Sequence, residues 1–225
     1  MRAIVQDRYG EANDVLRVEE VETPAPGEGE VLVRIRAASV NQQDCHVVTG
    51  IPYVMRATGY GLMRPSIRVR GTDAAGVVES VGEGVTMFAP GDEVIGWCEG
   101  SISEYGTAPQ DQWVAKPDGM SFEEAGCLGV AAFTALKGVR DVGAVGAGEK
   151  VLVNGASGGV GTFAVMVAKS LGAEVTGVCS GRNTEIVRGL GADHVIDYTQ
   201  EDFTTGTVHY DVLVDAVANH SLGAC

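Results

Sequence analysis

Residues 151–161, VLVNGASGGVG, join a short apolar run to a glycine-rich turn. Ala156, Gly158 and Gly161 fit G-x-G-x-x-G with alanine first, a pattern found where a strand turns into a helix that holds a dinucleotide pyrophosphate. Gly158 lets the backbone approach the pyrophosphate, and Gly161 lets the helix lie close to the strand. The alternative is a tight turn without a ligand. We expect a cofactor loop made of Ala156, Ser157, Gly158, Gly159, Val160 and Gly161.

The end of the next strand indicates which dinucleotide this loop would bind. NAD-binding proteins place an Asp or Glu there for the ribose 2′-hydroxyl. This chain has Ser180-Gly181-Arg182-Asn183 instead. Because a planar guanidinium donates two parallel hydrogen bonds to phosphate, Ser180 and Arg182 predict NADPH. The alternative for Arg182 is a solvated arginine after a strand.

The segments around the loop alternate between helix and strand patterns. Helices are expected over residues 159–171 and 184–190, and strands over 151–153, 174–179, 194–198 and 210–217. Such alternation is typical of βαβ units and a parallel sheet. The second half therefore predicts an α/β Rossmann domain that is incomplete, because the full doubly wound sheet has six strands.

The first half is dominated by strands. They are expected over residues 30–40, 72–81, 93–97, 103–108 and 113–116. In the first of these, Val31, Val33 and Ile35 alternate with Arg34 and Arg36, which indicates a half-buried antiparallel strand. Short strands punctuated by Gly and Pro favour a compact β-barrel.

The pattern changes near Ser121. Ser121 and Glu124 form a capping box, which should open one apolar helix that continues through Leu136. We expect a barrel domain over residues 1–120 and a dinucleotide-binding domain over residues 121–225.

Composition limits the possible partners and location. The 225 residues carry a net charge of −14, which argues against nucleic acid and anionic membranes as partners. The N-terminus lacks the apolar core of a signal peptide. The five cysteines are dispersed without a C-x-x-C pair, which predicts reduced thiols in the cytoplasm.

The order of barrel, linking helix and A-x-G-x-x-G unit resembles the medium-chain dehydrogenase/reductase superfamily. The local sequence is similar to its zinc-free, NADPH-dependent quinone oxidoreductase branch in the stretches APGEGEVLVRIRAASVNQQD, GTDAAGVVESVGEGV, FAPGDEVIGW, AAFTAL, NGASGGVGTFAVMVAKSLGAEVTGVCS and LGADHVIDY. The resemblance implies a GroES-like N-terminal domain before the Rossmann domain. It also implies longer relatives, whose last strand commonly makes a homodimer contact.

The resemblance further implies that no metal is bound. Zinc members place a Cys where this chain has Asn41 and a His where it has Thr72, and a catalytic zinc needs three Cys, His or carboxylate ligands. The adjacent Asp44, Cys45 and His46 could be interpreted as a metal site. The interpretation we favour has Cys45 packed and His46 lining the cleft.

The expected chemistry is hydride transfer from the nicotinamide to a quinone or an activated enone, whose conjugated oxygen accepts the developing charge. By resemblance, Asn41 and Thr134 lie near the nicotinamide, and Tyr198 flanks the adenosine phosphate. Tyr53 and His46 are candidate proton donors. For each of these residues a packing or local hydrogen-bonding role is the alternative. We expect Trp97, Trp113 and Met63 in the core or the cleft wall.

Three functions stay open at this point. The first is an NADPH-dependent quinone or enone reductase acting on a small molecule. The second is a non-catalytic NADPH-binding sensor or interaction protein, and the third is a zinc-independent alcohol dehydrogenase or enoyl reductase-like enzyme. A zinc alcohol dehydrogenase is opposed by Asn41 and Thr72.

Overall fold

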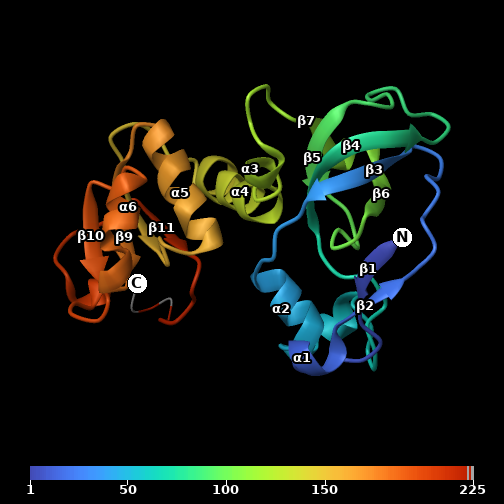
Figure 1. Ribbon diagram of the computed structural model, residues 1–225. Helices are drawn as coiled ribbons and strands as arrows, with labels where there is room; N and C mark the ends of the chain where they lie inside the picture. The colour runs from blue at the N-terminus through green and yellow to red at the C-terminus, as the bar shows by residue number, and fades with distance from the viewer. Residues whose placement is uncertain (222, 224–225) are drawn as a thin grey trace. The chain divides into compact units, whose positions relative to one another are not determined.

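The computed structural model describes residues 1–221 and 223 of the 225-residue chain. The chain divides into two compact units, Met1–Val130 and Ala131–Cys225. The first unit is built mainly of strands, and the second alternates strands with helices (Figure 1).

The first unit holds seven strands and three short α-helices that lie wholly within it. Its elements are β1 (Arg2–Val5), α1 (Ala12–Val15), β2 (Arg17–Glu20), β3 (Glu30–Ala37), α2 (Gln42–Thr49), η1 (Tyr53–Thr58), β4 (Asp73–Val81), β5 (Glu93–Trp97), β6 (Tyr105–Pro109), η2 (Gln110–Gln112), β7 (Trp113–Ala115) and α3 (Phe122–Ala125). All five strands expected from the sequence are present, and β5 has the expected bounds.

An antiparallel sheet in the order β6-β3-β4-β5-β7 forms the body of the first unit. In β3, Val31 and Val33 are fully buried and Arg34 is exposed, which confirms the half-buried strand. Leu32 is buried as well, because the pairing of β3 with β4 shifts register between Leu32 and Val33. Such a bulge places consecutive residues out of strict alternation. The sequence pattern did not reveal it.

The single helix expected from Ser121 to Leu136 is wrong. The capping box of Ser121 and Glu124 is present, but it opens only the short helix α3. A second helix, α4 (Gly129–Leu136), follows after a turn and leads into a π-helical segment, η3 (Lys137–Val142). Gly126 and Gly129 lie at the interruption, and glycine has low helix propensity.

The second unit continues from α4 with a parallel sheet and its helices. Its elements are β8 (Lys150–Asn154), α5 (Gly159–Ser170), β9 (Glu174–Cys179), η4 (Gly181–Asn183), α6 (Thr184–Gly189), β10 (His194–Asp197), η5 (Phe203–Thr205) and β11 (Val212–Asp215). The strand order β10-β9-β8-β11 with parallel pairing corresponds to the 3-2-1-4 part of the doubly wound sheet. The expected Rossmann-type arrangement is confirmed.

The core of the second unit forms between the sheet and α5. Val151, Val153 and Val175 are fully buried and share one hydrophobic cluster with Ala164 and Val165 of the helix. Small side chains on α5 allow the helix to approach the strands closely. The end of β8 and the start of α5 are therefore held firmly at the glycine-rich turn.

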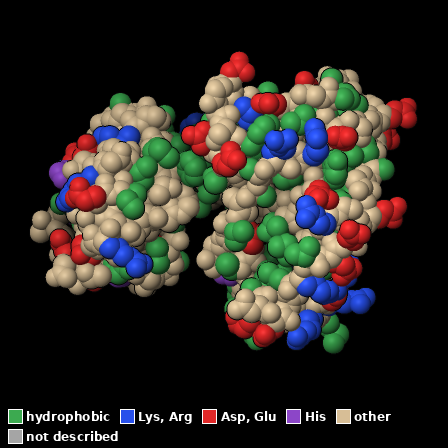
Figure 2. Space-filling model, in the orientation of Figure 1, with side chains coloured by type: hydrophobic (Ala, Val, Ile, Leu, Met, Phe, Trp, Pro, Cys, Tyr) green, Lys and Arg blue, Asp and Glu red, His purple; other side chains and the backbone are tan. Residues whose placement is uncertain are grey.

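The described residues include no helix long and apolar enough to cross a membrane. Acidic and basic side chains are interspersed over the face of the molecule shown in Figure 2. Cys225 lies outside the described residues.

The cysteines differ in exposure, so their labelling rates test the burial of Cys98 and Cys179 in the hydrophobic cores of the two units. Cys45 and Cys127 are exposed, whereas burial raises the pKa of the Cys98 thiol to about 12 and also raises the pKa of Cys179. Because the thiolate is the nucleophile, iodoacetamide at mildly alkaline pH should label Cys45 and Cys127 first. Peptide mapping by mass spectrometry measures each rate. Labelling of Cys98 in the native protein as fast as that of Cys127 would contradict the described burial.

Candidate functional site

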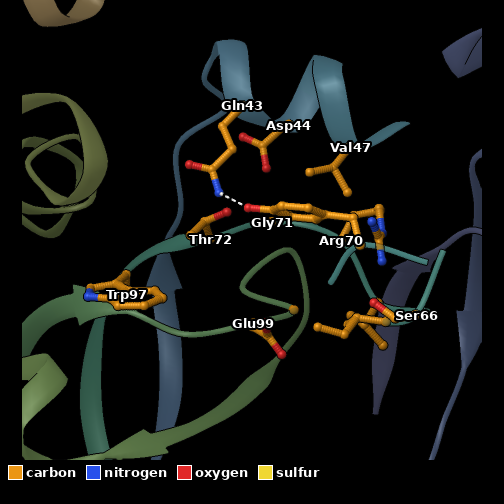
Figure 3. A pocket seen from close by; sticks show the side chains of 13 residues that line it. Gln43, Asp44, Val47, Ser66, Arg70, Gly71, Thr72, Trp97 and Glu99 are labelled. Carbon is orange, nitrogen blue, oxygen red and sulfur yellow. Dashed lines mark hydrogen bonds between the residues drawn. The ribbon is translucent and has the colours of Figure 1, made fainter. Parts of the chain in front are cut away.

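A cavity of about 90 Å³ lies in the first unit, beneath helix α2 (Figure 3). Its wall combines polar and apolar side chains from α2, from the segment before β4 and from the end of β5. The lining residues are Gln43, Asp44, Val47, Tyr60, Ser66, Ile67, Val69, Arg70, Gly71, Thr72, Trp97, Glu99 and Gly100. The amide of Gln43 donates to the hydroxyl of Tyr60 across this cavity at 3.3 Å.

Asn41 is the N-cap residue of helix α2, and its side chain makes one local hydrogen bond at each end of the amide. Its Oδ1 accepts the N–H of Gln43 at 2.9 Å, and its own N–H donates to the carboxylate of Asp44 at 2.8 Å. The second of these bonds belongs to a capping box between Asn41 and Asp44. Its Nδ2 points to Asp73, at 3.4 Å from Oδ2. The orientation of the Asn41 amide is therefore fixed on both sides.

Asp73, at the start of β4, supports this arrangement from below. Its side chain accepts hydrogen bonds from the Ser39 hydroxyl and from the N–H of Val130, both at 2.8 Å. A Cβ at Gly129 would lie 2.4 Å from the Asp73 carboxylate, so only glycine fits there. Asp73 is 1% exposed, and sequence reasoning did not single it out.

His46 and Tyr53 belong to α2 and to the η1 turn that follows it. Nδ1 of His46 lies 2.8 Å from the carbonyl of Ile51, which fixes the ring. Tyr53 is 69% exposed, and the Arg56 guanidinium lies 4.8 Å from its ring centre. Neither residue is part of the cavity wall.

The interpretation of Cys45 as packed is wrong, because Cys45 is exposed. Asp44 and Val48 lie on the buried face of α2, and Cys45 lies on another face of the same helix. The pKa of Asp44 is raised by burial, which the N–H of Asn41 and the hydroxyl of Thr72 oppose. Within the described part of the chain, no group of three or more His, Cys, Asp or Glu side chains could hold a metal ion. Asn41 and Thr72 carry an amide and a hydroxyl, and neither is among the usual protein ligands of zinc.

In the second unit, the glycine-rich turn has the shape of a phosphate cradle. Gly158 is the N-cap of α5 and is exposed, so the backbone there can be approached from solvent. A Cβ at Gly161 would lie 2.1 Å from the carbonyl oxygen of Gly155, which shows how closely the helix and the turn are packed. As in every α-helix, the first N–H groups of α5 have no carbonyl partner within the helix. Ala156 is fully buried beneath the turn. These features fit a dinucleotide pyrophosphate.

The turn after β9 lies beside this cradle. The amide of Asn183 donates to the Ser157 hydroxyl at 3.0 Å, which joins the two loops. The carboxylate of Asp197, at the end of β10, accepts the N–H of Gly181 and two hydrogen bonds from Thr199. Arg182 is exposed, and no described residue accepts a hydrogen bond or an ion pair from its guanidinium.

The remaining expected site residues are open to solvent. Tyr198 is 61% exposed next to β10, and Thr134 is exposed on α4. Trp97 lines the cavity and Trp113 is fully buried, which agrees with the expected roles of both. Met63 is 88% exposed in the turn-rich segment after η1, so it is not part of the core.

The chain matches two family models. Residues 27–118 match the alcohol dehydrogenase GroES-like domain, and residues 159–224 match the zinc-binding dehydrogenase family. Among curated proteins, it is 38% identical over 207 residues to a chloroplastic quinone-oxidoreductase homolog of Spinacia oleracea, covering 88% of this chain and 61% of the relative. It is also 30% identical to a quinone oxidoreductase of Sus scrofa, covering 99% of this chain and 68% of the relative.

Solved structures show the same relationship. The quinone oxidoreductase of Coxiella burnetii superposes with a TM-score of 0.87 at 30% identity, covering 96% of this chain and 68% of that one. The JamJ enoyl reductase gives 0.85 at 30% identity, with coverages of 97% and 68%. The quinone oxidoreductase of Escherichia coli complexed with NADPH gives 0.80 at 27% identity, with coverages of 91% and 61%.

Fold and similarity together define a class. The chain belongs to the medium-chain dehydrogenase/reductase superfamily, in its quinone oxidoreductase-like branch, with a GroES-like first domain. It spans 61% of the length of the chloroplastic relative.

The close packing at Gly161 leads to a prediction for stability. Gly161→Ala should lower the free energy of unfolding by about 1–3 kcal/mol, because the new methyl group meets a backbone carbonyl that cannot move aside. Chemical denaturation measures the effect. Gly189→Ala is the matched control, since nothing lies within 4 Å of a Cβ at that helical position. A Gly161→Ala protein as stable as the Gly189→Ala protein would rule out the described contact.

Proposed function

We propose that this protein is an NADPH-dependent oxidoreductase that reduces a quinone or an activated enone without zinc. The observation that carries the proposal is the pairing of an open phosphate cradle at Gly158 with an unengaged guanidinium at Arg182. Arginine donates to phosphate through a planar fork, and Asn183 links the two loops through Ser157. When bound, NADPH supplies a hydride to the acceptor.

The nearby carboxylate of Asp197 is compatible with a 2′-phosphate. Its oxygens are engaged by hydrogen bonds from the N–H and the hydroxyl of Thr199 and from the N–H of Gly181, which hold the pKa of Asp197 below its usual range. The carboxylate therefore binds backbone N–H groups of the loop through hydrogen bonds. Arg182 remains available on the same loop.

The choice of acceptor rests on similarity and on donor chemistry. Two relatives are named quinone oxidoreductases, and one superposed structure is an enoyl reductase. Asn41 and Thr72 do not supply a zinc ligand set, so the acceptor must stabilise developing charge through conjugation and hydrogen bonds. We assign Asn41, whose amide is held by Asp73 and by the N–H of Gln43, to the nicotinamide ribose and the acceptor carbonyl.

Other assignments belong to the same proposal. Thr134 is placed beside the nicotinamide and Tyr198 beside the adenosine phosphate. We also propose a cytoplasmic location, based on the unpaired cysteines of the described chain, and a homodimer. The competing function is an NADPH-binding sensor that lacks turnover, which the two proton-donor candidates, an exposed Tyr53 and a half-buried His46, leave open.

The first experiment measures binding and turnover on one sample. Calorimetry with NADPH and with NADH tests cofactor preference, and NADPH consumption with para-benzoquinone tests the reaction. NADPH-selective binding with turnover supports the reductase. Selective binding without turnover supports the sensor. A protein that neither binds NADPH nor consumes it would overturn the proposal.

Cofactor preference is predicted to depend on Arg182. Arg182→Ala should weaken NADPH binding by about 1.5–3 kcal/mol, the contribution of a charged hydrogen-bonded pair, and should leave NADH binding almost unchanged. Arg188→Ala is a matched control, because Arg188 is an exposed arginine on α6 paired with Glu185 at 2.6 Å. Equal losses for both cofactors in the Arg182 variant would remove the assignment to the 2′-phosphate.

The proton donor is tested by Tyr53→Phe and His46→Ala. If one of these side chains donates the proton, its variant should lower kcat by about 100-fold or more, the usual contribution of general acid catalysis. Steady-state rates with a quinone and with an enoyl thioester measure this. If neither variant changes kcat, both assignments are wrong and solvent supplies the proton.

A further inference from the structure

The cavity of the first unit contains a buried cation that the proposed reaction does not use. Arg70 lies just before β4 and is 5% exposed. Its backbone is pinned, since its N–H donates to Ile4 at 2.9 Å and its carbonyl accepts the N–H of Ile102 at 2.8 Å. The position from which its side chain enters the cavity wall is therefore fixed (Figure 3).

The guanidinium of Arg70 lacks hydrogen-bond partners. Across residues 1–221 and 223, no acceptor is found for it, and its Nε is both buried and unpaired. A buried donor without an acceptor is costly, and the cost is larger for a charged group. An acceptor supplied by a ligand would relieve it.

The other charges of the wall decide what kind of acceptor fits. The cavity is lined by one guanidinium and two carboxylates, those of Asp44 and Glu99. Burial lowers the pKa of Arg70, while Tyr9, Asp44 and Glu99 oppose this shift. The lining is thus net negative, so an anion would be repelled by two carboxylates while it met one cation. A neutral oxygen with a free lone pair meets the unpaired donors without that repulsion.

The apolar part of the wall indicates the rest of the ligand. Trp97 and Val47 lie on the cavity together with Ile67 and Val69. A flat conjugated ring can pack against an indole face. The polar groups then specify orientation, as in most small-molecule sites.

We propose that Arg70 is a binding residue for a carbonyl oxygen of a neutral, conjugated ligand in this cavity, and that it selects quinones over carboxylate-bearing acceptors. This inference rests on the proposed function, because it names the substrate class of that reaction. It concerns only the first unit and needs no cofactor.

Binding of duroquinone, a fully methylated benzoquinone, tests the proposal in the absence of NADPH. Its methyl groups block addition by the exposed thiols of Cys45 and Cys127. Quenching of tryptophan fluorescence reports binding, and Trp97→Phe identifies the cavity as the source of the signal, since Trp113 is fully buried. Arg70→Met should raise Kd about tenfold or more, and Arg70→Lys should recover part of the affinity because it keeps a charged donor. An unchanged Kd in Arg70→Met would overturn the proposal.

A second variant avoids disturbing the buried arginine. Glu99→Gln removes one exposed carboxylate from the wall and leaves Arg70 in place. It should improve the weak binding of benzoate, because one of the two carboxylates that repel an anion is removed. If the wild-type protein binds benzoate more tightly than duroquinone, the preference for a neutral ligand is wrong. This outcome does not depend on whether the Arg70 variants fold.

Direct binding separates this inference from the proposed function. Arg70-dependent duroquinone binding without NADPH consumption would support the inference and sink the reductase. If the wild-type protein consumes NADPH and the Arg70→Met variant binds duroquinone as tightly as wild type does, the reductase is supported and the inference is overturned.

Discussion

The carboxylate of Asp73 accepts hydrogen bonds from the Ser39 hydroxyl, the Asn41 amide and the N–H of Val130. Ser39 and Asn41 lie in the connection between β3 and α2, and Val130 lies in α4, so one buried side chain at the start of β4 joins this connection to α4. A buried acceptor loses its hydration on folding, and each of its partners must therefore stay in place. The orientation of Asn41, and with it the α2 wall of the cavity, depends on this interaction.

In the second unit, the position of helix α5 depends on close packing of small residues. Gly161 lies against the Gly155 carbonyl, and small residues of α5 pack on β8 and β9. This packing brings the start of α5 to the ends of the strands, where backbone N–H groups remain available. The two units thus differ in the kind of surface that they offer to a ligand. One surrounds a cavity with buried charge, and the other presents open backbone at a helix terminus.

Much of the fold could be predicted from local sequence, and part of the site could not. The strands, the glycine-rich turn and the parallel sheet follow from short-range patterns. The interruption between α3 and α4 did not follow, because apolar content over 125–136 outweighed two glycines in the prediction. Arg68 and Arg70 show the limit most clearly. They are the same residue type two positions apart, yet Arg68 forms exposed ion pairs with Asp7 and Glu19, whereas Arg70 is buried by tertiary contacts.

The loop that carries Arg182 is held by bonds that do not involve that side chain. Asp197 fixes the N–H of Gly181, and Asn183 is tied to Ser157, so the residues on either side are anchored and the one between them is not. Position 182 can therefore accept other side chains without any rebuilding of the backbone around it. For protein engineering, and for divergence between relatives, the charge that this loop presents to solvent becomes a trait that one codon can alter while the scaffold stays unchanged.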